Sequence, residues 1–252
     1  MDFKNKTVVI TGASKGIGAA CAQLFFSEGA NLVLLDTAPG ETGIKDARWL
    51  FIQCDVSVEK EVIDAMAQGH NTFGSIDILV NNAGIQRYGT VTETTSSEWD
   101  EVFNVNLKSQ FLCAKYAIPY MLKINAGVIV NMASVQAFLS QKNVSAYSTA
   151  KTAVLGLTRC IAIDYAPQIR CVAVCPGTID TPMLRDAINL SPDPGEVMQE
   201  CIDMHLAGRI GTPREVAELV LFLSSEKASF ITGEAIRVDG GLGIAIAGSK
   251  RN

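Results

Sequence analysis

Seven short runs rich in β-branched and aromatic residues, separated by longer amphipathic stretches, constrain the fold more than any other feature of this chain. The runs expected to be strands are residues 7–11, 31–36, 49–55, 76–81, 127–133, 170–175 and 235–238. Several of them are apolar on both faces, as is typical of strands in a parallel sheet that helices cover on both sides. The alternation therefore predicts an α/β fold: one doubly wound domain over residues 1–252, with a central parallel sheet of about seven strands.

Helical periodicity fills most of the segments between these runs. The expected helices are residues 16–28, 58–71, 97–123, 145–165 and 214–224. Thr212, Pro213 and Glu215 supply an N-cap, a first-turn proline and an early acidic residue for the last of them. Residues 182–211 differ, because they hold three prolines and several methionines. We expect this segment to be an excursion over the carboxyl edge of the sheet that acts as a substrate lid.

Charge and composition exclude several classes of protein. The net charge of −5 and the absence of a Lys/Arg block argue against nucleic acid and anionic membrane surfaces as partners. No apolar run approaches the roughly 20 residues of a membrane helix or forms a signal-peptide core, which predicts a cytoplasmic protein. With two histidines and no C-x-x-C pair, no metal site is expected, and the seven cysteines are interpreted as buried reduced thiols.

A glycine-rich turn follows the first expected strand and leads directly into a helix. Glycines there permit a tight turn and the close approach of a pyrophosphate to the helix N-terminus. The spacing G-x-x-x-G-x-G departs from the common G-x-G-x-x-G, and an ordinary glycine-rich turn is the alternative. The residues predicted to bind a dinucleotide at this turn are Gly12, Ser14, Lys15, Gly16, Ile17 and Gly18.

Asp36 closes the second expected strand, where a carboxylate can accept hydrogen bonds from both hydroxyls of an adenosine ribose and repel a 2′-phosphate. Lys15 could attract that phosphate, or it could be a solvated surface lysine. Because a carboxylate in direct hydrogen-bond range should outweigh a flexible cation, NAD is favoured over NADP. The residues expected to border the adenine and ribose, at the ends of the third and fourth strands, are Asp55, Val56, Asn82, Ala83 and Gly84.

Tyr147 and Lys151 lie four residues apart on an expected helix and therefore on one face of it. A fixed cation favours the phenolate and should lower the pKa of Tyr147, which would make it a general base, although the pair could equally be a surface pair. Ser134 could bind a developing oxyanion or cap a turn, and the mid-helix amide of Asn106 is unfavourable unless it has a specific role. A Ser–His hydrolytic pair is disfavoured, since neither histidine has a nucleophile motif beside it.

Together these residues resemble the short-chain dehydrogenase/reductase family along the full chain, with further matches at residues 176–181, 209–211 and 238–241. The resemblance implies a Rossmann-type NAD(P)-binding domain, an enzyme that acts on CH–OH groups, and a homotetramer. It implies a catalytic tetrad of Asn106, Ser134, Tyr147 and Lys151, in which Asn106 anchors a water of a proton relay and Lys151 also binds the nicotinamide ribose. The residues that it implies around the nicotinamide are Pro176, Gly177, Ile179 and Thr181, with Ile179 and Thr181 holding the carboxamide.

Residues 132–137, 142–147 and 163–182 look closer still to the sugar 1-dehydrogenases of the aldohexose branch, of the glucose or mannose type. This resemblance implies a role in carbohydrate metabolism: the oxidation of an aldohexose at C1 to an aldonolactone. Similar sugar enzymes carry an acidic residue where this chain has Gln86. The candidate substrate-binding residues are Ser134, Tyr147 and the amides of Gln86, Gln136 and Asn143, which could read sugar hydroxyls or be solvated loop residues.

Two alternatives to a sugar dehydrogenase stay open at this point. The same residues could reduce another carbonyl, such as a 3-oxoacyl thioester or a keto acid. A catalytically silent dinucleotide-binding regulator is the other alternative, which the intact tetrad disfavours. The tail, residues 242–252, could fold over a neighbouring subunit's site or fray.

Overall fold

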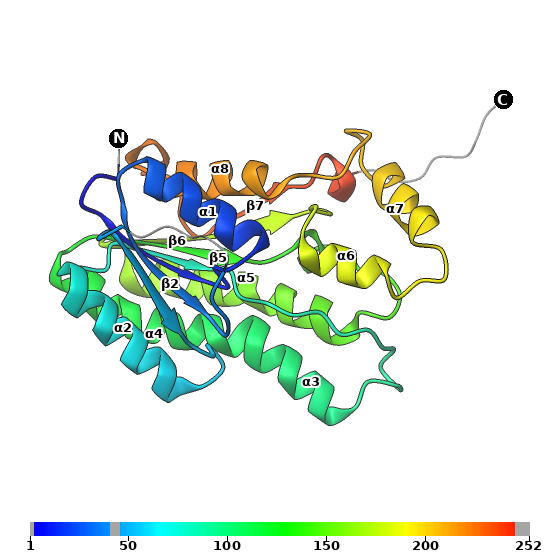
Figure 1. The fold of residues 1–252 in the computed structure, drawn as a ribbon, viewed down its shortest axis with the longest axis horizontal. Helices are drawn as coiled ribbons and strands as arrows, with labels where there is room; N and C mark the ends of the chain where they lie inside the picture. Colours follow the sequence, from blue (N-terminus) through cyan, green and yellow to red (C-terminus); the bar gives the residue numbers. More distant parts are fainter. Residues whose placement is uncertain (1–2, 41–45, 245–252) are drawn as a thin grey trace.

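A computed structural model describes residues 3–40 and 46–244 of the chain. Its centre is one parallel sheet of seven strands in the order β3-β2-β1-β4-β5-β6-β7 (Figure 1). The strands are β1 (Thr7–Thr11), β2 (Asn31–Asp36), β3 (Trp49–Gln53), β4 (Ile78–Asn81), β5 (Gly127–Met132), β6 (Ile169–Pro176) and β7 (Ala235–Val238). The predicted doubly wound α/β fold is confirmed.

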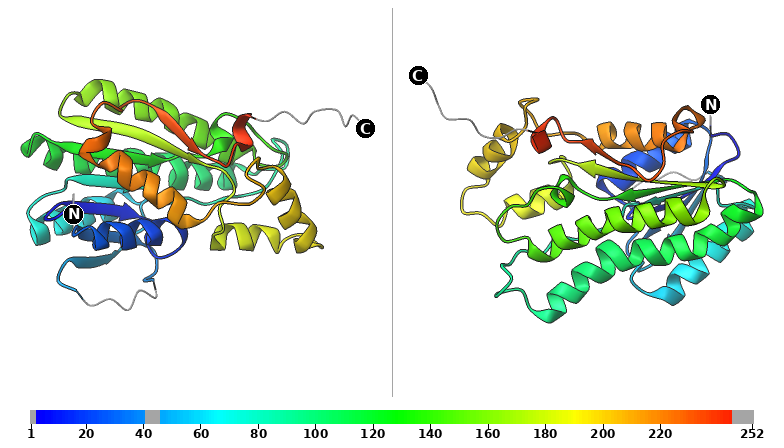
Figure 2. Two further views of the ribbon diagram at one scale, coloured as in Figure 1. Left: turned by 90° about the horizontal axis from the view of Figure 1, so that it is seen from above. Right: turned by 180° about the vertical axis from the view of Figure 1, so that it is seen from behind.

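Helices cover both faces of the sheet, as Figures 1 and 2 show. One face packs against α1 (Gly16–Ser27) and α8 (Pro213–Ser224), and the other against α2 (Glu59–Phe73), α4 (Ser109–Lys123) and α5 (Ser145–Tyr165). Successive residues of β1 supply both cores: Val8 and Ile10 belong to the first, Val9 to the second, and all three are fully buried. Burial on both faces explains why these strands read as continuous apolar runs.

The single helix expected over residues 97–123 is interrupted in the structure. It consists of α3 (Ser96–Phe103), a π-helical turn (Asn104–Lys108) and α4. The backbone N–H of Ser109 donates to the carbonyl of Asn104, five residues back, which is the π-helical pattern. Hydrophobic periodicity is too coarse to show one extra residue within a turn.

The segment 182–211 contains two helices that were not predicted, α6 (Pro182–Ile188) and α7 (Pro194–Asp203), and Figure 1 shows both beyond one end of the sheet. Thr181 and Asp193 cap their N-termini through their side chains. The sequence predicted an excursion here without assigned helices, whereas Pro182 and Pro194 occupy first-turn positions, where proline is favoured. At Thr212, by contrast, the predicted cap and first-turn proline are confirmed.

Two of the seven cysteines differ from the expectation that all are buried thiols. All seven cysteines are free, and five are buried, but Cys160 is exposed and Cys201 is half-buried, so the expectation of buried thiols was wrong for these two. Within residues 3–40 and 46–244, no helix is long and apolar enough to cross a membrane. The end of the tail, from residue 245, lies outside the described residues.

Candidate active site

The glycine-rich turn after β1 has a backbone that only glycine fits. Gly12 and Gly16 adopt φ values of +62° and +57°, which favour glycine. A Cβ atom on Gly18 would lie 2.1 Å from the Gly12 carbonyl oxygen, and one on Gly12 would lie 2.9 Å from the Cα of Ala83. The turn therefore presents bare backbone at the start of α1, the geometry that a pyrophosphate requires.

Asn82 locks this turn to the end of β4. Its side-chain nitrogen donates to the carbonyl oxygens of Thr11 and Gly12, each at 3.0 Å. The Thr11 hydroxyl oxygen in turn accepts from the backbone N–H groups of Asn82 and Ala83, at 2.9 and 3.0 Å. These bonds hold two of the predicted dinucleotide-binding loops as one rigid unit.

Asp36 lies beside the same turn, at the end of β2. Its Oδ2 accepts from the Ser14 backbone N–H at 2.9 Å, and its Oδ1 accepts from the Thr37 N–H at 2.8 Å. Lys15 is the exposed N-cap residue of α1, while Ile17 packs against the core behind it. The carboxylate is thus fixed next to the predicted pyrophosphate site, and the lysine is not held there.

Asp55 follows β3 instead of ending it, because the strand stops at Gln53. Its Oδ1 accepts from both the N–H and the hydroxyl of Ser57, at 2.9 and 2.7 Å, which shapes the turn into α2. Val56 is buried in the core between the sheet and the helices α2, α4 and α5. The contact of this turn with adenine stays a prediction.

Ser134 and Tyr147 face each other. Ser134 follows β5, and its oxygen accepts from the Gln136 N–H at 3.1 Å, so the capping alternative is realised. The Ser134 side chain also lies near enough to the phenol of Tyr147, on α5, to oppose the rise in its pKa that burial causes. One hydroxyl therefore shapes its own turn and lies beside the candidate base.

Lys151 lies one helical turn along α5, only 3% exposed, with its Nζ 5.6 Å from the centroid of the Tyr147 ring. The ammonium donates to the Met132 carbonyl at 2.8 Å. Burial lowers the pKa of Lys151 to about 8 and raises the pKa of Tyr147 to about 12, although Ser134 opposes the latter. The sequence predicted a lowered pKa for Tyr147, whereas desolvation raises it, and Lys151 is not among the groups that shift it.

Asn106 is fully buried within the π turn. Its Oδ1 accepts from the Ile85 N–H at 3.0 Å, and its Nδ2 donates to the Ile85 carbonyl at 2.8 Å. A Cβ on Gly84 would lie 2.7 Å from this Oδ1 and 3.5 Å from the Nζ of Lys151. The Asn106 amide thus positions the 84–85 turn beside the lysine, and its link to a water relay stays a prediction.

Residues 12–243 match the family model described as Enoyl-(Acyl carrier protein) reductase. The chain is 38% identical over 245 residues to Dehydrogenase/reductase SDR family member 6 of Danio rerio, covering 94% of this chain and 96% of that protein. This chain belongs to the short-chain dehydrogenase/reductase family. It is accordingly an oxidoreductase that uses a nicotinamide dinucleotide, as the sequence predicted.

Two solved structures are similar to this dehydrogenase/reductase over nearly its whole length. Ligand-free aldohexose dehydrogenase of Thermoplasma acidophilum has a TM-score of 0.93 and 43% identity, covering 99% of this chain and 98% of that one. Levodione reductase has a TM-score of 0.92 and 34% identity, covering 97% and 100%.

The predicted nicotinamide loop of this dehydrogenase/reductase follows β6, which ends at Pro176. Ile179 is 7% exposed, and the loop is tied to Gly211 through the Asp180 N–H and the Thr178 carbonyl, both at 2.9 Å. Thr181 approaches the glycine-rich turn, since a Cβ on Gly16 would lie 3.3 Å from its methyl group. The predicted nicotinamide loop and the predicted pyrophosphate turn thus lie next to each other.

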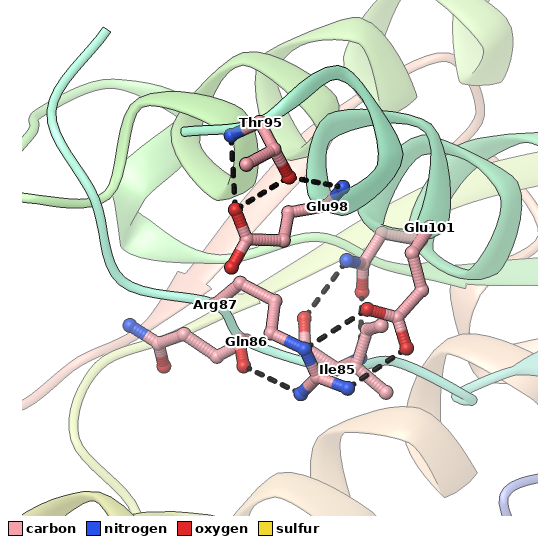
Figure 3. Close-up of polar contacts among 7 residues, drawn as sticks. Ile85, Gln86, Arg87, Thr95, Glu98 and Glu101 are labelled. Atoms are coloured by element: carbon pink, nitrogen blue, oxygen red, sulfur yellow. Dashed lines mark hydrogen bonds and ion pairs between the residues drawn. The ribbon is translucent and has the colours of Figure 1, made fainter. Parts of the chain in front are cut away.

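The predicted substrate residues lie on three loops of the dehydrogenase/reductase. Gln136 accepts from the Ser148 hydroxyl at 3.2 Å, and the exposed Asn143 accepts on its carbonyl from the Gly89 N–H at 2.8 Å. Figure 3 shows the Gln86 side chain extending away from the ion pair that Arg87 makes with Glu101. These loops border the site, but direct contact of their amides with a substrate stays a prediction.

Two polar side chains beside the tetrad, those of Tyr88 and Gln110, were not predicted from the sequence. Tyr88 is 44% exposed, lies near enough to raise the pKa of Tyr147, and stands next to Gly89. Gln110 is 1% exposed and donates from Nε2 to the Met132 carbonyl at 3.1 Å, so this oxygen serves both Gln110 and Lys151. An amide inside an apolar helix stretch could have indicated Gln110, whereas no local pattern indicates Tyr88.

Proposed function

We propose that this enzyme oxidises an aldohexose at C1 to an aldonolactone, with NAD as the hydride acceptor and Tyr147 as the general base. The observation that carries the proposal is the likeness, at 43% identity and TM-score 0.93, to a protein described as an aldohexose dehydrogenase. The mutual placement of Ser134, Tyr147 and Lys151 supports it, since these groups converge at the end of β5. Gln86, Gln136 and Asn143 would read the ring hydroxyls.

In this mechanism Ser134 and Tyr147 hold the C1 hydroxyl, and the phenolate of Tyr147 accepts its proton. Because burial raises the pKa of the phenol to about 12, forming the phenolate requires positive charge nearby. NAD, when bound, would supply such charge and accept the hydride. Lys151, held by Met132, would then stabilise the phenolate and orient the nicotinamide ribose.

The residues present fit a dinucleotide. Gly12 and Gly18 have no room for a Cβ, because the backbone of Ala83 and Gly12 lies within 3 Å, so the turn keeps the tight bare-backbone shape that a pyrophosphate requires. Asp36, fixed by the Ser14 N–H, supports NAD over NADP, because its charge opposes a 2′-phosphate. We further propose that residues 182–211 form a lid over the sugar, and that the enzyme works as a cytoplasmic homotetramer in carbohydrate metabolism.

Levodione reductase, at 34% identity and TM-score 0.92, favours a second candidate, the reduction of a ketone by the same residues. Initial rates with NAD and a panel of aldohexoses, measured against NADH with cyclic diketones and 3-oxoacyl thioesters, distinguish the two. Sugar oxidation with lactone as the product is expected. Turnover of ketones with none of any aldose would replace the first proposal by the second. Light scattering tests the tetramer.

A further inference from the structure

His205 connects the segment that holds α6 and α7 to the predicted nicotinamide loop. It follows α7 by two residues and is only 4% exposed. Its Nδ1 lies 2.7 Å from the Cys201 carbonyl oxygen, and its Nε2 lies 3.1 Å from the Thr178 backbone nitrogen. Because a carbonyl only accepts and a backbone N–H only donates, the ring must be neutral, with its proton on Nδ1.

Two glycines leave room for the imidazole ring of His205. A Cβ on Gly177 would lie 2.9 Å from Nε2, and one on Gly240 would lie 3.3 Å from Cδ2. The ring also lines a cavity of about 70 Å³, together with Ile179 and Asp239 among others. Two glycines thus leave the space for this imidazole on the inner side of the loop that would hold the carboxamide.

The hydrogen bond to His205 fixes the Thr178 backbone N–H, which lies next to the part of the loop predicted to hold the carboxamide. Thr178 stands between Gly177 and Ile179, and its carbonyl accepts from the Gly211 N–H at 2.9 Å. If the ring is lost, the Thr178 N–H has no acceptor in a closely packed place, and the loop must shift to satisfy it. Such a shift would move Ile179 and Thr181 together.

We propose that His205 is a positioning residue, which holds the 177–181 loop in the shape that receives nicotinamide and joins α7 to it. The proposal rests on the proposed function, because it requires the dinucleotide site. His205 should therefore affect the nicotinamide half of the coenzyme and not the adenosine half. Asp36 ends β2, and three strands, β1, β4 and β5, separate β2 from β6. At about 4.8 Å per strand, β2 and β6 lie roughly 19 Å apart, and the loop approaches the glycine-rich turn at Thr181, three residues beyond the Thr178 that His205 holds.

Two substitutions of His205 separate its two hydrogen bonds. In His205→Gln the amide oxygen can reach the place of Nε2 and keep an acceptor for Thr178. In His205→Asn the shorter amide can replace Nδ1 as the donor to Cys201 but cannot reach Thr178. His70→Asn is the matched control, because its ring lies on α2, with its centroid 4.4 Å from that of the Tyr120 ring.

Fluorescence titration of each full-length variant with NADH and calorimetric titration with ADP-ribose test the proposal. His205→Asn is expected to weaken NADH binding about tenfold, the loss typical of an unpaired buried N–H, and to leave ADP-ribose binding unchanged. His205→Gln and His70→Asn should bind both ligands like the wild type.

Three results would overturn the proposal: wild-type NADH affinity in His205→Asn, an equal loss of both ligands in that variant, or equal losses of NADH affinity in the Asn and Gln variants. The second would mean that the ring only stabilises the fold. A wild-type protein that binds NADH but oxidises no sugar would overturn the proposed function alone, because these titrations need no sugar.

Discussion

Replacing Lys151 with methionine should stabilise the protein while it abolishes turnover. The pKa of the buried ammonium falls from its ordinary value of 10.5 to about 8. Since one pKa unit corresponds to about 1.4 kcal/mol, keeping this group charged costs the folded protein about 3 kcal/mol at pH 7. Methionine has a similar length and no charge. It would not leave the Met132 carbonyl unpaired, because Gln110 still donates to it at 3.1 Å.

The stability that Lys151→Met gains over the wild type should depend on pH. Between pH 8 and 10.5 the unfolded wild type binds more protons at this lysine than the folded protein does, so the wild type gains stability as the pH rises. The advantage of Lys151→Met should therefore shrink from about 3 kcal/mol at pH 7 to about 1.4 kcal/mol at pH 9.5.

Urea unfolding at both pH values, at one protein concentration, measures the difference. Lys15→Met, at an exposed lysine, is the control and should give no such gain. A Lys151→Met protein that is less stable than the wild type at pH 7, or whose advantage does not change with pH, would refute the reasoning.

Four further outcomes are expected. Tyr147→Phe should lower kcat by about 10³-fold and leave the NADH dissociation constant unchanged, and retained turnover would remove Tyr147 from its role. Because oxidation needs the Tyr147 phenolate, whose pKa burial raises to about 12, and the Lys151 ammonium, whose pKa burial lowers to about 8, kcat/KM for NAD should rise with pH up to about pH 8 and level off above it, and a flat profile between pH 6 and 8 would contradict this. Gly18→Ala should abolish NAD binding, since its Cβ would meet the Gly12 oxygen at 2.1 Å, whereas Gly156→Ala on α5, with nothing within 4 Å, should bind NAD normally and gain up to about 1 kcal/mol of stability. Asp36→Ser should raise the NADP-to-NAD ratio of kcat/KM at least about tenfold, and an unchanged ratio would leave coenzyme choice to other residues.

The sequence was sufficient for the strands and their parallel arrangement because each buried strand is a continuous apolar run. It was also sufficient to bring Ser134, Tyr147 and Lys151 together, since one follows a strand and two share a helix face. Sequence spacing could not reveal the balance between charge and desolvation at Tyr147. That balance depends on how closely the site is packed, which is a property of the folded protein.

Features that arise from contacts between distant segments were not predictable. Gln110 and Met132 are 22 residues apart, and His205 and Thr178 are 27 apart, so no periodicity relates them. The helices α6 and α7 were missed for another reason, because no helix start was assigned at their first-turn prolines. A proline after Thr or Asp is better interpreted as a possible helix start.

The π turn sets the rotational phase between α3 and α4. An α-helix advances about 100° per residue, so one extra residue in residues 104–108 turns everything after it by that angle relative to α3. Deleting one residue of this turn would restore a regular helix, but Asn106 could then no longer bond to Ile85 while Gln110 bonds to Met132 and α3 and α4 keep their packing. A single-residue length change in this helix should therefore be far less tolerated than most substitutions along it.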